Sequence, residues 1–283
     1  LFAGDYVWPT LTPDEMPGIE GIIHMPDFAL KVSRSERLSE ARARLNEFFG
    51  RKYPERFTAD DVHYVPQPDG EVLCMINYTS GSTGNPKGVM IPYRALWSNY
   101  QFAIEVLGST CKSGDRVVSM LPMAHMYGMA FEFLFEFLHG IHIHFLNRLP
   151  SPKIIVQAFA EVKPCIVIAV PLIIEKIIRK NVLPKVQTHT MQMLLRMPVV
   201  KGKILEKIRF EIQKVFGGRF YEVIMGGAGL NPDVENFLRK IGFNYTVGYG
   251  ATECAPIMSY EDWHRFAQGS CGKVAPRMEV KIN

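Results

Sequence analysis

The sequence predicts an α/β protein in which mostly parallel sheets are flanked by helices. Short apolar, β-prone runs alternate with segments of helical periodicity along most of the chain, a pattern typical of parallel sheets. With 283 residues, of which 47% are hydrophobic, the chain can bury a large core in one domain or two. Glycine-rich turns follow several predicted strands, at the carboxyl ends where α/β proteins bind ligands.

The predicted order of elements starts with a strand at 71–78 and a helix at 92–107. The strand segment, "EVLCMINY", is short, mostly apolar and β-prone, which predicts a buried strand. In the helix segment apolar residues recur at helical spacing, and Pro92 suits an early helical turn. The rest of the chain continues this alternation. Further strands are predicted at 115–121, 141–146, 165–170, 219–225 and 244–249, and further helices at 126–139, 152–162, 171–180, 188–197, 203–216 and 232–241.

The segment between the first strand and the first helix carries the main functional signal. It reads "YTSGSTGNPKG" (78–88) and combines glycines, hydroxyl side chains and Lys87. Glycine lets backbone N–H groups approach an anion closely, hydroxyls donate hydrogen bonds and lysine adds a positive charge. The layout of strand, loop and helix therefore predicts a phosphate site; a flexible connector is the alternative. The Walker A pattern is not met because Lys87 precedes Gly88, and G-x-G-x-x-G is not met because no glycine stands two positions after Gly81.

Composition excludes several classes of protein. The net charge is +4 and the basic residues alternate with acidic ones, so nucleic-acid binding is not predicted. The five cysteines form no C-x-x-C pair, which predicts reduced thiols, as in the cytoplasm. The longest apolar stretch, "CIVIAVPLII" (165–174), is too short to span a membrane as a helix and contains Pro171.

The helix predicted near 126–139 is rich in methionine and phenylalanine. Its Glu132 and Glu136 lie on one helical face. We expect a buried helix that has one solvated edge or lines a pocket. A large apolar pocket of this composition suits an alkyl chain.

Two further segments are assigned structural roles. His142 and His144 lie on one face of a strand, but no cysteine or carboxylate stands beside them in the sequence, so no metal site is predicted there. The segment 33–49 alternates charges along a helix, which predicts a solvated surface helix, with partner or membrane contact as the alternative.

Two more glycine clusters follow predicted strands. "IMGGAGL" (224–230) precedes a helix, and "VGYGATE" (247–253) follows the last strand of the series. In the second cluster Tyr249 stands between two glycines, so its ring can present a face to a planar group. Thr252 and Glu253 follow, and a hydroxyl beside a carboxylate suits phosphate and Mg²⁺.

Several of these motifs together resemble a known family. "YTSGSTGNPKG", "LPMAHMYG" (121–128), "GGAGL" and "GYGATE" occur in the order and spacing of the adenylate-forming superfamily. Within it the chain is similar to long-chain fatty acyl-CoA synthetases (AMP-forming), and "GSCGKVAPRMEVKI" (269–282) resembles the segment that follows in that branch. The resemblance runs from about residue 70 to the end, and it implies the acyl-CoA synthetase-like N-terminal domain. It implies a ligase that joins a fatty acid to CoA with ATP, through an acyl-adenylate and with release of AMP and diphosphate.

The resemblance also implies roles for individual residues. Lys87 would support the phosphate loop or the diphosphate, and His125 would stand at the mouth of the acyl pocket. Thr252 would contact the α-phosphate and Glu253 would bind Mg²⁺, so these four residues are the catalytic candidates. The residues implied to hold the nucleotide are Thr79, Ser80, Gly81, Ser82, Thr83 and Gly84 at the β- and γ-phosphates, and Gly227, Ala228, Gly248, Tyr249 and Gly250 around the adenine.

The chain departs from the family pattern in two respects. Gly229 stands where the family usually has proline, which would loosen that turn without removing a ligand. The sequence ends at Asn283, before the family's ribose-binding aspartate and its small C-terminal domain. We therefore expect a fragment that runs the full reaction poorly or not at all by itself. Its expected parts are 1–112, with the phosphate loop, a second α/β subdomain at 113–258, and the start of a β-rich subdomain at 259–283.

The implied substrates are a fatty acid, ATP and CoA, with Mg²⁺ as the cofactor. A cytoplasmic location is expected, and peripheral membrane association and a homodimer stay open. An aryl-CoA ligase, an amino-acid-activating domain and a nucleotide-binding module without catalysis are the alternatives. An amino-acid activator would need an acidic partner for the α-amine, and the pocket-forming segments show none.

Overall fold

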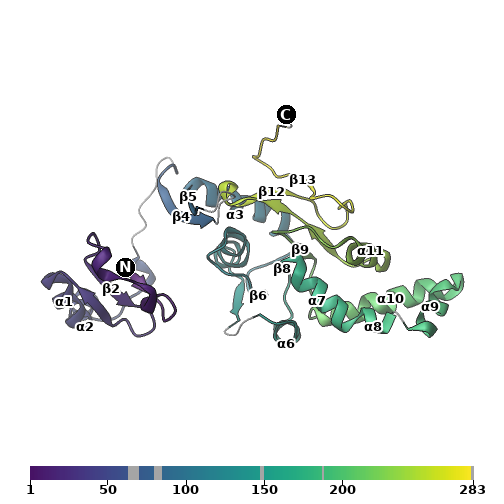
Figure 1. Ribbon diagram of the computed structural model, residues 1–283, viewed down its shortest axis with the longest axis horizontal. Coiled ribbons are helices and arrows are strands. Elements are labelled where there is room, and N and C mark those ends of the chain that lie inside the picture. Colours follow the sequence, from purple (N-terminus) through teal and green to yellow (C-terminus); the bar gives the residue numbers. More distant parts are fainter. Residues whose placement is uncertain (63–69, 80–84, 147–149, 187, 282–283) are drawn as a thin grey trace. The chain divides into compact units, whose positions relative to one another are not determined.

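The computed structural model describes residues 1–62, 70–79, 85–146, 150–186 and 188–281 (Figure 1). The chain forms two compact units, Leu1–Pro66 and Gln67–Asn283. This division does not test the boundaries expected at 112 and 258, which stay predictions.

The first unit is a small α/β body. Its three-stranded sheet has the order β1-β2-β3, and the surface helix expected at 33–49 is found as two helices that meet at Arg44. The side chain of Ser35 accepts a hydrogen bond from the Leu38 N–H and so begins the first helix. No residue of the two helices is buried, so the prediction of a solvated surface is confirmed. The elements are β1 (Phe2–Ala3), η1 (Trp8–Thr10), η2 (Pro13–Glu15), β2 (Gly21–His24), β3 (Leu30–Ser33), α1 (Glu36–Ala43), α2 (Leu45–Lys52) and η3 (Ala59–Asp61).

Parallel strands form the centre of the second unit. β6 (Arg116–Ser119) pairs with β7 (His142–Phe145), and a three-stranded sheet has the order β10-β9-β8. Strands β8 (Val167–Ala169), β9 (Val223–Met225) and β10 (Tyr245–Val247) are short and almost entirely buried, as their apolar sequences predict. The N–H of Cys165 donates to the carbonyl of Arg116 at 2.9 Å and links the β8 segment to β6. The predicted α/β class is confirmed.

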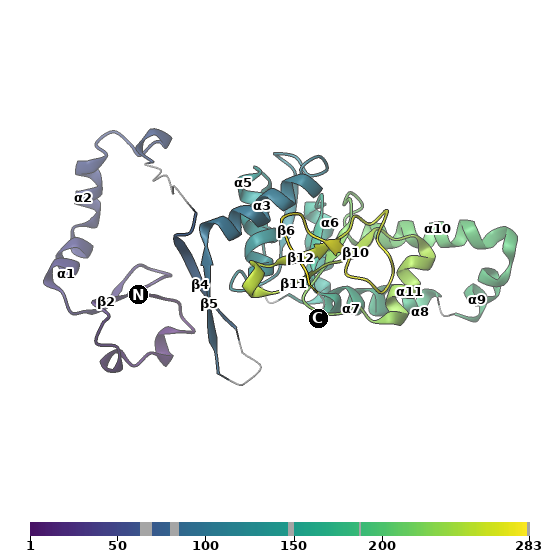
Figure 2. The same ribbon diagram turned by 90° about the horizontal axis from the view of Figure 1, so that it is seen from above.

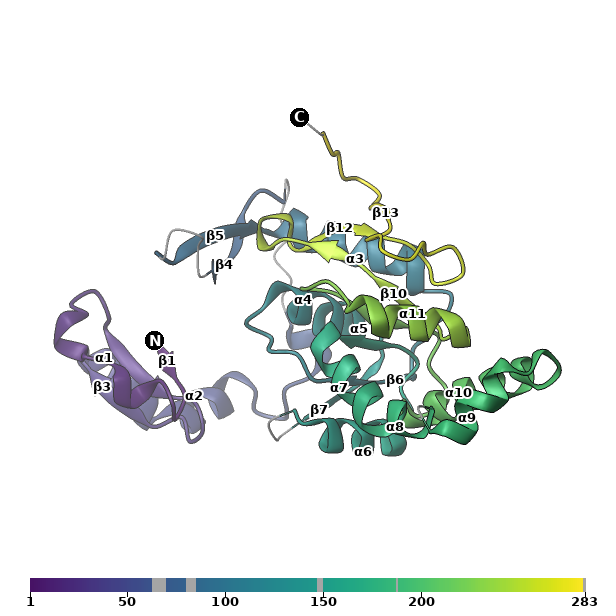
Figure 3. The same ribbon diagram turned by 45° about the vertical axis from the view of Figure 1, so that its right-hand side comes forward.

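Helices cover these strands and supply most of the core. Phe159, Ile177, Phe216 and Leu238 are fully buried in one cluster with Val223, and the rings of Phe159 and Phe216 lie 5.6 Å apart between centroids. In all three views α9 and the adjoining end of α10 extend away from the sheet (Figures 1, 2 and 3). The helices are α3 (Tyr93–Leu107), α6 (Pro152–Val162), α7 (Pro171–Asn181), α8 (Leu183–Val186), α9 (His189–Arg196), α10 (Pro198–Val215) and α11 (Pro232–Ile241), close to the predicted ranges.

The segment around the predicted phosphate loop differs from the prediction. β4 (Leu73–Thr79) pairs antiparallel with β5 (Lys87–Pro92), and only then does α3 begin (Figure 2). Strand, loop and helix is therefore the wrong layout, because "KGVMIP" continues the hairpin, and the loop does not lie at the carboxyl end of a parallel strand. The prediction of a buried strand is also wrong, since Tyr78 is 71% exposed on a sheet of only two strands.

The helix predicted near 126–139 is present, with an irregular centre. It consists of α4 (Met126–Gly128), the π-helical η4 (Met129–Leu134) and α5 (Phe135–Leu138). Of the two alternatives expected for this helix, the solvated edge is not found, because Glu132 is 2% and Glu136 is 1% exposed, whereas the helix does line a pocket. Buried carboxylates are rare, and the environment of Glu132 is part of the site described below.

The chain after β10 forms an antiparallel sheet. Its order is β11-β12-β13, from β11 (Tyr249–Gly250), β12 (Ile257–Tyr260) and β13 (Lys273–Val274), with η5 (Thr252–Cys254) between the first two. Among the described helices, none combines the length and the apolar character needed to cross a bilayer.

Candidate functional site

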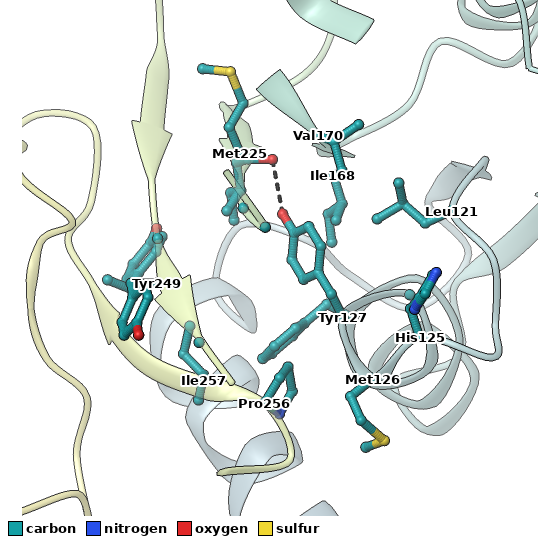
Figure 4. A pocket seen from close by; sticks show the side chains of 18 of the residues that line it. Leu121, His125, Met126, Tyr127, Ile168, Val170, Met225, Tyr249, Pro256 and Ile257 are labelled. Carbon is teal, nitrogen blue, oxygen red and sulfur yellow. Dashed lines mark hydrogen bonds between the residues drawn. The ribbon is translucent and has the colours of Figure 1, made fainter. Parts of the chain in front are cut away.

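An apolar cavity of about 340 Å³ lies at the carboxyl ends of the parallel strands β8, β9 and β10. Its walls come from α3, the segment 121–131 and the ends of these strands, and its polar edge comes from the glycine turns (Figure 4). The lining side chains that the sequence did not single out include Phe102, Val106, Leu107, Ile168, Val170, Ile224, Pro256, Ile257 and Tyr260.

Tyr127 crosses the cavity from α4 to the end of β9 (Figure 4). Its hydroxyl donates a hydrogen bond to the carbonyl of Ile224 at 3.1 Å. Gly226 lies under the ring, where an added Cβ would stand 3.1 Å from two ring carbons. Burial raises the pKa of Tyr127, so the phenol stays a neutral donor. Because Gly226 has no side chain, the ring of Tyr127 can lie against it and close one side of the cavity.

The first glycine turn follows β9. Gly227 lines the cavity and has a φ of +82°, a value that glycine adopts without strain, whereas Ala228 is exposed outside the lining. The turn ends at Asn231, whose side chain accepts hydrogen bonds from the first N–H groups of α11. Glu175 on α7 accepts the Asn231 N–H at 2.9 Å, which fixes the turn against the core.

The second glycine turn follows β10. Gly248, Tyr249, Gly250 and Thr252 all line the cavity, whereas Glu253 is exposed outside the lining. Tyr249 is 54% exposed, so part of the residue is open to a ligand.

Asn99 on α3 fixes this second turn, and sequence reasoning missed it. Its amide nitrogen donates to the carbonyl of Cys254 at 3.3 Å, and its amide oxygen accepts the N–H of Ile257 at 3.0 Å. The side chain is 4% exposed, so these bonds are shielded from water. The available signal was an asparagine, Asn99, on the apolar face of a predicted helix. Such a side chain is buried and needs polar partners, so a structural role could have been predicted for it.

His125 lies at the rim of the cavity, exposed and at the N-terminal end of α4. Two buried side chains hold the loop that carries it. The amide of Asn77 on β4 donates to the carbonyl of Ala124 at 2.7 Å. One carboxylate oxygen of Glu132 accepts the N–H groups of Met120 and Leu121 at 3.0 and 2.7 Å.

Glu132 is held in an environment that opposes its ionisation. Burial raises the pKa of Glu132 to about 7, although the backbone N–H groups of Leu121 and Met120 oppose that shift. Its other carboxylate oxygen has no hydrogen-bond partner among the described residues. The loop between β6 and α4 thus depends on a carboxylate that titrates near neutral pH.

The predicted phosphate loop is described only at its two ends. Thr79 ends β4 and Lys87 begins β5, and these two residues face each other in the hairpin register. Neither of them lines the cavity. Ser80, Gly81, Ser82, Thr83 and Gly84 lie outside the described residues.

The residues present are compatible with Mg²⁺ that is bound largely by substrate. In the described part of the chain, no three His, Cys, Asp or Glu side chains are grouped as in a protein-only metal site, His142 and His144 included. Mg²⁺ usually keeps several waters and binds one or two carboxylates together with substrate phosphates, so the exposed carboxylate of Glu253 suits such a role.

Comparison with known proteins agrees with the resemblance seen in the sequence motifs. Residues 17–283 match the family described as AMP-binding enzyme, so the similarity begins well before residue 70, where the sequence motifs start. Long-chain-fatty-acid--CoA ligase 2 of Schizosaccharomyces pombe is 29% identical over 235 residues, which cover 76% of this chain and 34% of that protein. Long chain acyl-CoA synthetase 8 of Arabidopsis thaliana is 30% identical over 245 residues, which cover 77% of this chain and 33% of that protein. The chain thus spans about a third of the length of these curated relatives.

Solved structures share the fold. A long-chain-fatty-acid-CoA ligase from Archaeoglobus fulgidus superposes with a TM-score of 0.59 at 17% identity, over 94% of this chain and 45% of that one. The ATP-bound MatB from Rhodopseudomonas palustris gives a TM-score of 0.58 at 18% identity, over 90% of this chain and 40% of that one.

Proposed function

The chain belongs to the AMP-binding enzyme family, and we propose that it carries the acyl and nucleotide sites of an AMP-forming fatty acid–CoA ligase. In this reaction a fatty-acid carboxylate oxygen attacks the α-phosphorus of ATP, and the bond to diphosphate breaks. The thiol of CoA then attacks the acyl carbon of the adenylate, and AMP leaves with the electron pair of the broken C–O bond. The observation that carries the proposal is the apolar cavity whose polar edge is formed by the two glycine turns.

The cavity is suited to an uncharged hydrocarbon chain. Its side chains are mostly apolar, and among the described residues that line it none is acidic or a lysine or arginine. The hydroxyl of Tyr127, which lines the cavity, is already hydrogen-bonded to the Ile224 carbonyl. Burial of an alkyl chain there stabilises the complex by about 0.8 kcal/mol per CH₂ group.

The nucleotide would lie along the polar edge of the cavity. The open part of the Tyr249 ring can stack on adenine next to the backbone of Gly227. Thr252 would donate its hydroxyl to the α-phosphate and so place that phosphorus at the cavity entrance, where the carboxylate of the fatty acid arrives. Magnesium, held with Glu253, would supply positive charge to the phosphates.

Lys87 and the hydroxyls of the 78–88 loop would bind the β- and γ-phosphates. Diphosphate carries several negative charges as it leaves, and cationic and hydroxyl donors that are already oriented stabilise that charge. In this proposal the two tasks are separate, because the acyl chain would bind in the cavity while the phosphates would bind at the hairpin.

The alternatives predict different cavity chemistry. An amino-acid activator needs a carboxylate near the substrate amine, and the cavity lining does not provide one among the described residues. An aryl acid is apolar and remains a second candidate, since Phe102 and Phe131 line the same cavity. A module that binds ATP without catalysis would bind nucleotide but release no diphosphate.

Isotope exchange between diphosphate and ATP separates these proposals. The full-length protein is assayed with alkyl acids of increasing length, aryl acids and amino acids. Exchange that requires alkyl acids supports the proposal, exchange with aryl acids alone supports the second candidate, and no exchange with any acid, while ATP still binds, indicates a module without catalysis. Thr252→Val should reduce exchange at least tenfold, whereas Thr190→Val, at an exposed position outside the cavity lining, should not.

The five free thiols of the chain favour a reducing compartment, and we place the reaction in the cytoplasm on that basis. Membrane association and a homodimer stay predictions.

A further inference from the structure

A second cleft, of about 630 Å³, lies at the opposite ends of the parallel strands. Residues that begin β6 or precede β8, β9 and β10 line it, whereas the glycine turns of the apolar cavity follow β9 and β10. The cleft is polar, and nothing in the proposed ligase reaction uses it. Its lining includes Asp115, Arg116, Lys163, Arg219, Tyr221 and Asn244.

Hydrogen bonds join the four chain segments that line this cleft. The N–H of Cys165 donates to the carbonyl of Arg116 at 2.9 Å, and the carbonyl of Cys165 accepts the N–H of Tyr221 at 2.8 Å. The carbonyl of Tyr221 in turn accepts the side-chain amide of Asn244 at 2.9 Å. The backbone of the cleft is therefore held in place, and the side chains that it carries start from fixed positions.

Three cationic side chains line the cleft. Arg116 begins β6, Lys163 follows α6 and Arg219 precedes β9, so they come from separate parts of the chain. None of the three side chains forms an ion pair or a hydrogen bond with a residue that the structure describes. Positive charges that share one cleft repel each other, and a bound anion would relieve that repulsion.

The carboxylate of Asp115 does not balance these charges. Asp115 is the one acidic side chain among the described lining residues, and its Oδ2 already accepts the N–H of Lys112 at 2.8 Å. One carboxylate faces three cations, so the described part of the cleft has an excess of positive charge.

Helix ends account for only one of the three cations. Lys163 caps the C-terminus of α6, where the helix dipole favours a positive charge. Arg116 belongs to a strand, and Arg219 lies beyond Phe216, which caps α10. The dipole effect is confined to the last turn of a helix, so the two arginines are left without an electrostatic partner in the described protein.

The chemistry of the lining favours a phosphate ester. Guanidinium groups bind phosphate oxygens through paired N–H donors, and an ammonium group adds a further charge. The cleft has room for more than one phosphate group, and its other side chains are largely polar. The amide oxygen of Asn244 accepts no hydrogen bond from a described residue, so it can accept one from a ligand hydroxyl.

We propose that this cleft binds a phosphate monoester of a small polyhydroxy compound, such as a sugar phosphate. Arg116, Arg219 and Lys163 bind the phosphate, and the hydroxyl-bearing part lies beside Asn244. The site shares no lining residue with the apolar cavity. It is therefore independent of the proposed ligase reaction.

The test is calorimetric titration of the full-length protein at low ionic strength with glucose 6-phosphate, inorganic phosphate and glucose. Low salt is used because the three cations are exposed and their attraction for an anion is screened. We expect glucose 6-phosphate to bind most tightly, inorganic phosphate to bind more weakly and glucose not to bind.

Matched variants assign the binding to the cleft. The double variant Arg116→Gln, Arg219→Gln should weaken glucose 6-phosphate binding at least tenfold. The double variant Lys203→Gln, Lys207→Gln removes the same number of exposed positive charges from α10 and should change the affinity less than about twofold. Lys87→Gln, in the proposed phosphate loop, should also leave this affinity unchanged.

Four results would overturn the proposal. They are no binding of glucose 6-phosphate to the wild type, an equal loss of affinity in the two double variants, a loss in Lys87→Gln alone, and inorganic phosphate binding as tightly as the ester. Circular dichroism verifies that each variant folds. Diphosphate exchange tests the ligase proposal separately, because it should be the same in the wild type and in both double variants.

Discussion

Asn99 and Cys254 are joined by a hydrogen bond of 3.3 Å from the buried side-chain amide of the first to the backbone carbonyl of the second, across 155 positions of sequence. The same side chain accepts the N–H of Ile257, so a single residue of α3 holds both sides of the turn in which Thr252 and Glu253 lie. The proposed nucleotide site therefore depends on a residue that does not line the cavity.

Asn99→Ala should lower the free energy of unfolding by about 1–3 kcal/mol, because it leaves the partly buried carbonyl of Cys254 and N–H of Ile257 without their side-chain partner. Urea-induced unfolding measures this loss. Gln157→Ala, which removes an exposed side-chain hydrogen bond on α6, should change stability by less than about 0.5 kcal/mol. Equal effects in the two variants would contradict the role given to Asn99.

Replacement by alanine should weaken ATP binding at Gly250 but not at Gly229. A Cβ at Gly250 would stand 2.4 Å from the carbonyl oxygen of Pro256, so Gly250→Ala must displace the turn and weaken ATP binding about tenfold or more. Nothing lies within 4 Å of a Cβ at Gly229, and its φ is not in the left-handed region, so Gly229→Ala should bind ATP like the wild type. Calorimetric titration with ATP measures the affinity of both variants. A loss of ATP affinity in Gly229→Ala would contradict this account of the turn.

Tyr249→Leu should raise the Kd for ATP by about 5-fold to 150-fold, because stacking of a base on an aromatic ring contributes about 1–3 kcal/mol. Tyr6→Leu, which changes a 96% exposed ring in the first unit, is the matched control. Unchanged ATP affinity in Tyr249→Leu would show that adenine does not lie on this ring.

Val170→Phe should shift substrate preference toward shorter acids. The larger side chain occupies part of the cavity, and lost contacts of one methylene cost about 10-fold or more in kcat/KM. Diphosphate exchange over a series of chain lengths measures the shift. Leu172→Phe, two residues farther on and exposed outside the cavity, should keep the wild-type profile, and a parallel shift in both variants would contradict this placement of the acyl chain.

Glu222 should make the protein less stable as the pH rises. Burial raises the pKa of Glu222 to about 8, although its hydrogen bond with Tyr260 opposes the shift; the nearby Asp262 raises it further, and the Trp263 N–H opposes it. Between about pH 4.5 and 8 the folded state keeps the proton that the unfolded state has lost. The free energy of unfolding therefore falls as the pH rises, by up to about 1.4 kcal/mol per unit.

Glu222→Gln should remove this part of the pH dependence. Its stability relative to the wild type should increase from pH 5 to pH 8, as measured by urea unfolding at several pH values. The exposed Glu206→Gln should follow the wild-type curve. A constant difference between Glu222→Gln and the wild type across this range would mean that Glu222 is already ionised.

The sequence predicted the parallel strands and their glycine turns well because both have local signals. Apolar β-prone runs marked β8, β9 and β10, and positions such as Gly227 require backbone that only glycine adopts easily. The hairpin of β4 and β5 was missed because the loop between them resembles other phosphate loops that lead into helices. The sequence of β5 gave a weaker signal than the strong helical pattern of α3, which begins directly after it, so only the helix was predicted.

The supporting polar groups could not be predicted from local sequence. Asn77, Asn99 and Glu132 each bind backbone atoms from distant or separate segments, and those partners become neighbours only in the folded chain. Glu132 also looked like part of a solvated helical face, because a carboxylate is seldom buried. The Ser119 hydroxyl and the N–H groups of Met120 and Leu121, at the end of β6, donate hydrogen bonds to Glu132. These bonds offset the free-energy cost of burying its carboxylate.

The hairpin has a practical consequence for handling the protein. Among the strands that the structure describes, β4 and β5 pair only with each other, and Ile76, Tyr78 and Met90 expose large apolar side chains along them. Strand edges with unpaired N–H and C=O groups beside apolar side chains are templates for pairing between molecules. Concentrated solutions should therefore aggregate through residues 73–92, and replacing Met90 with lysine should raise solubility without altering the core.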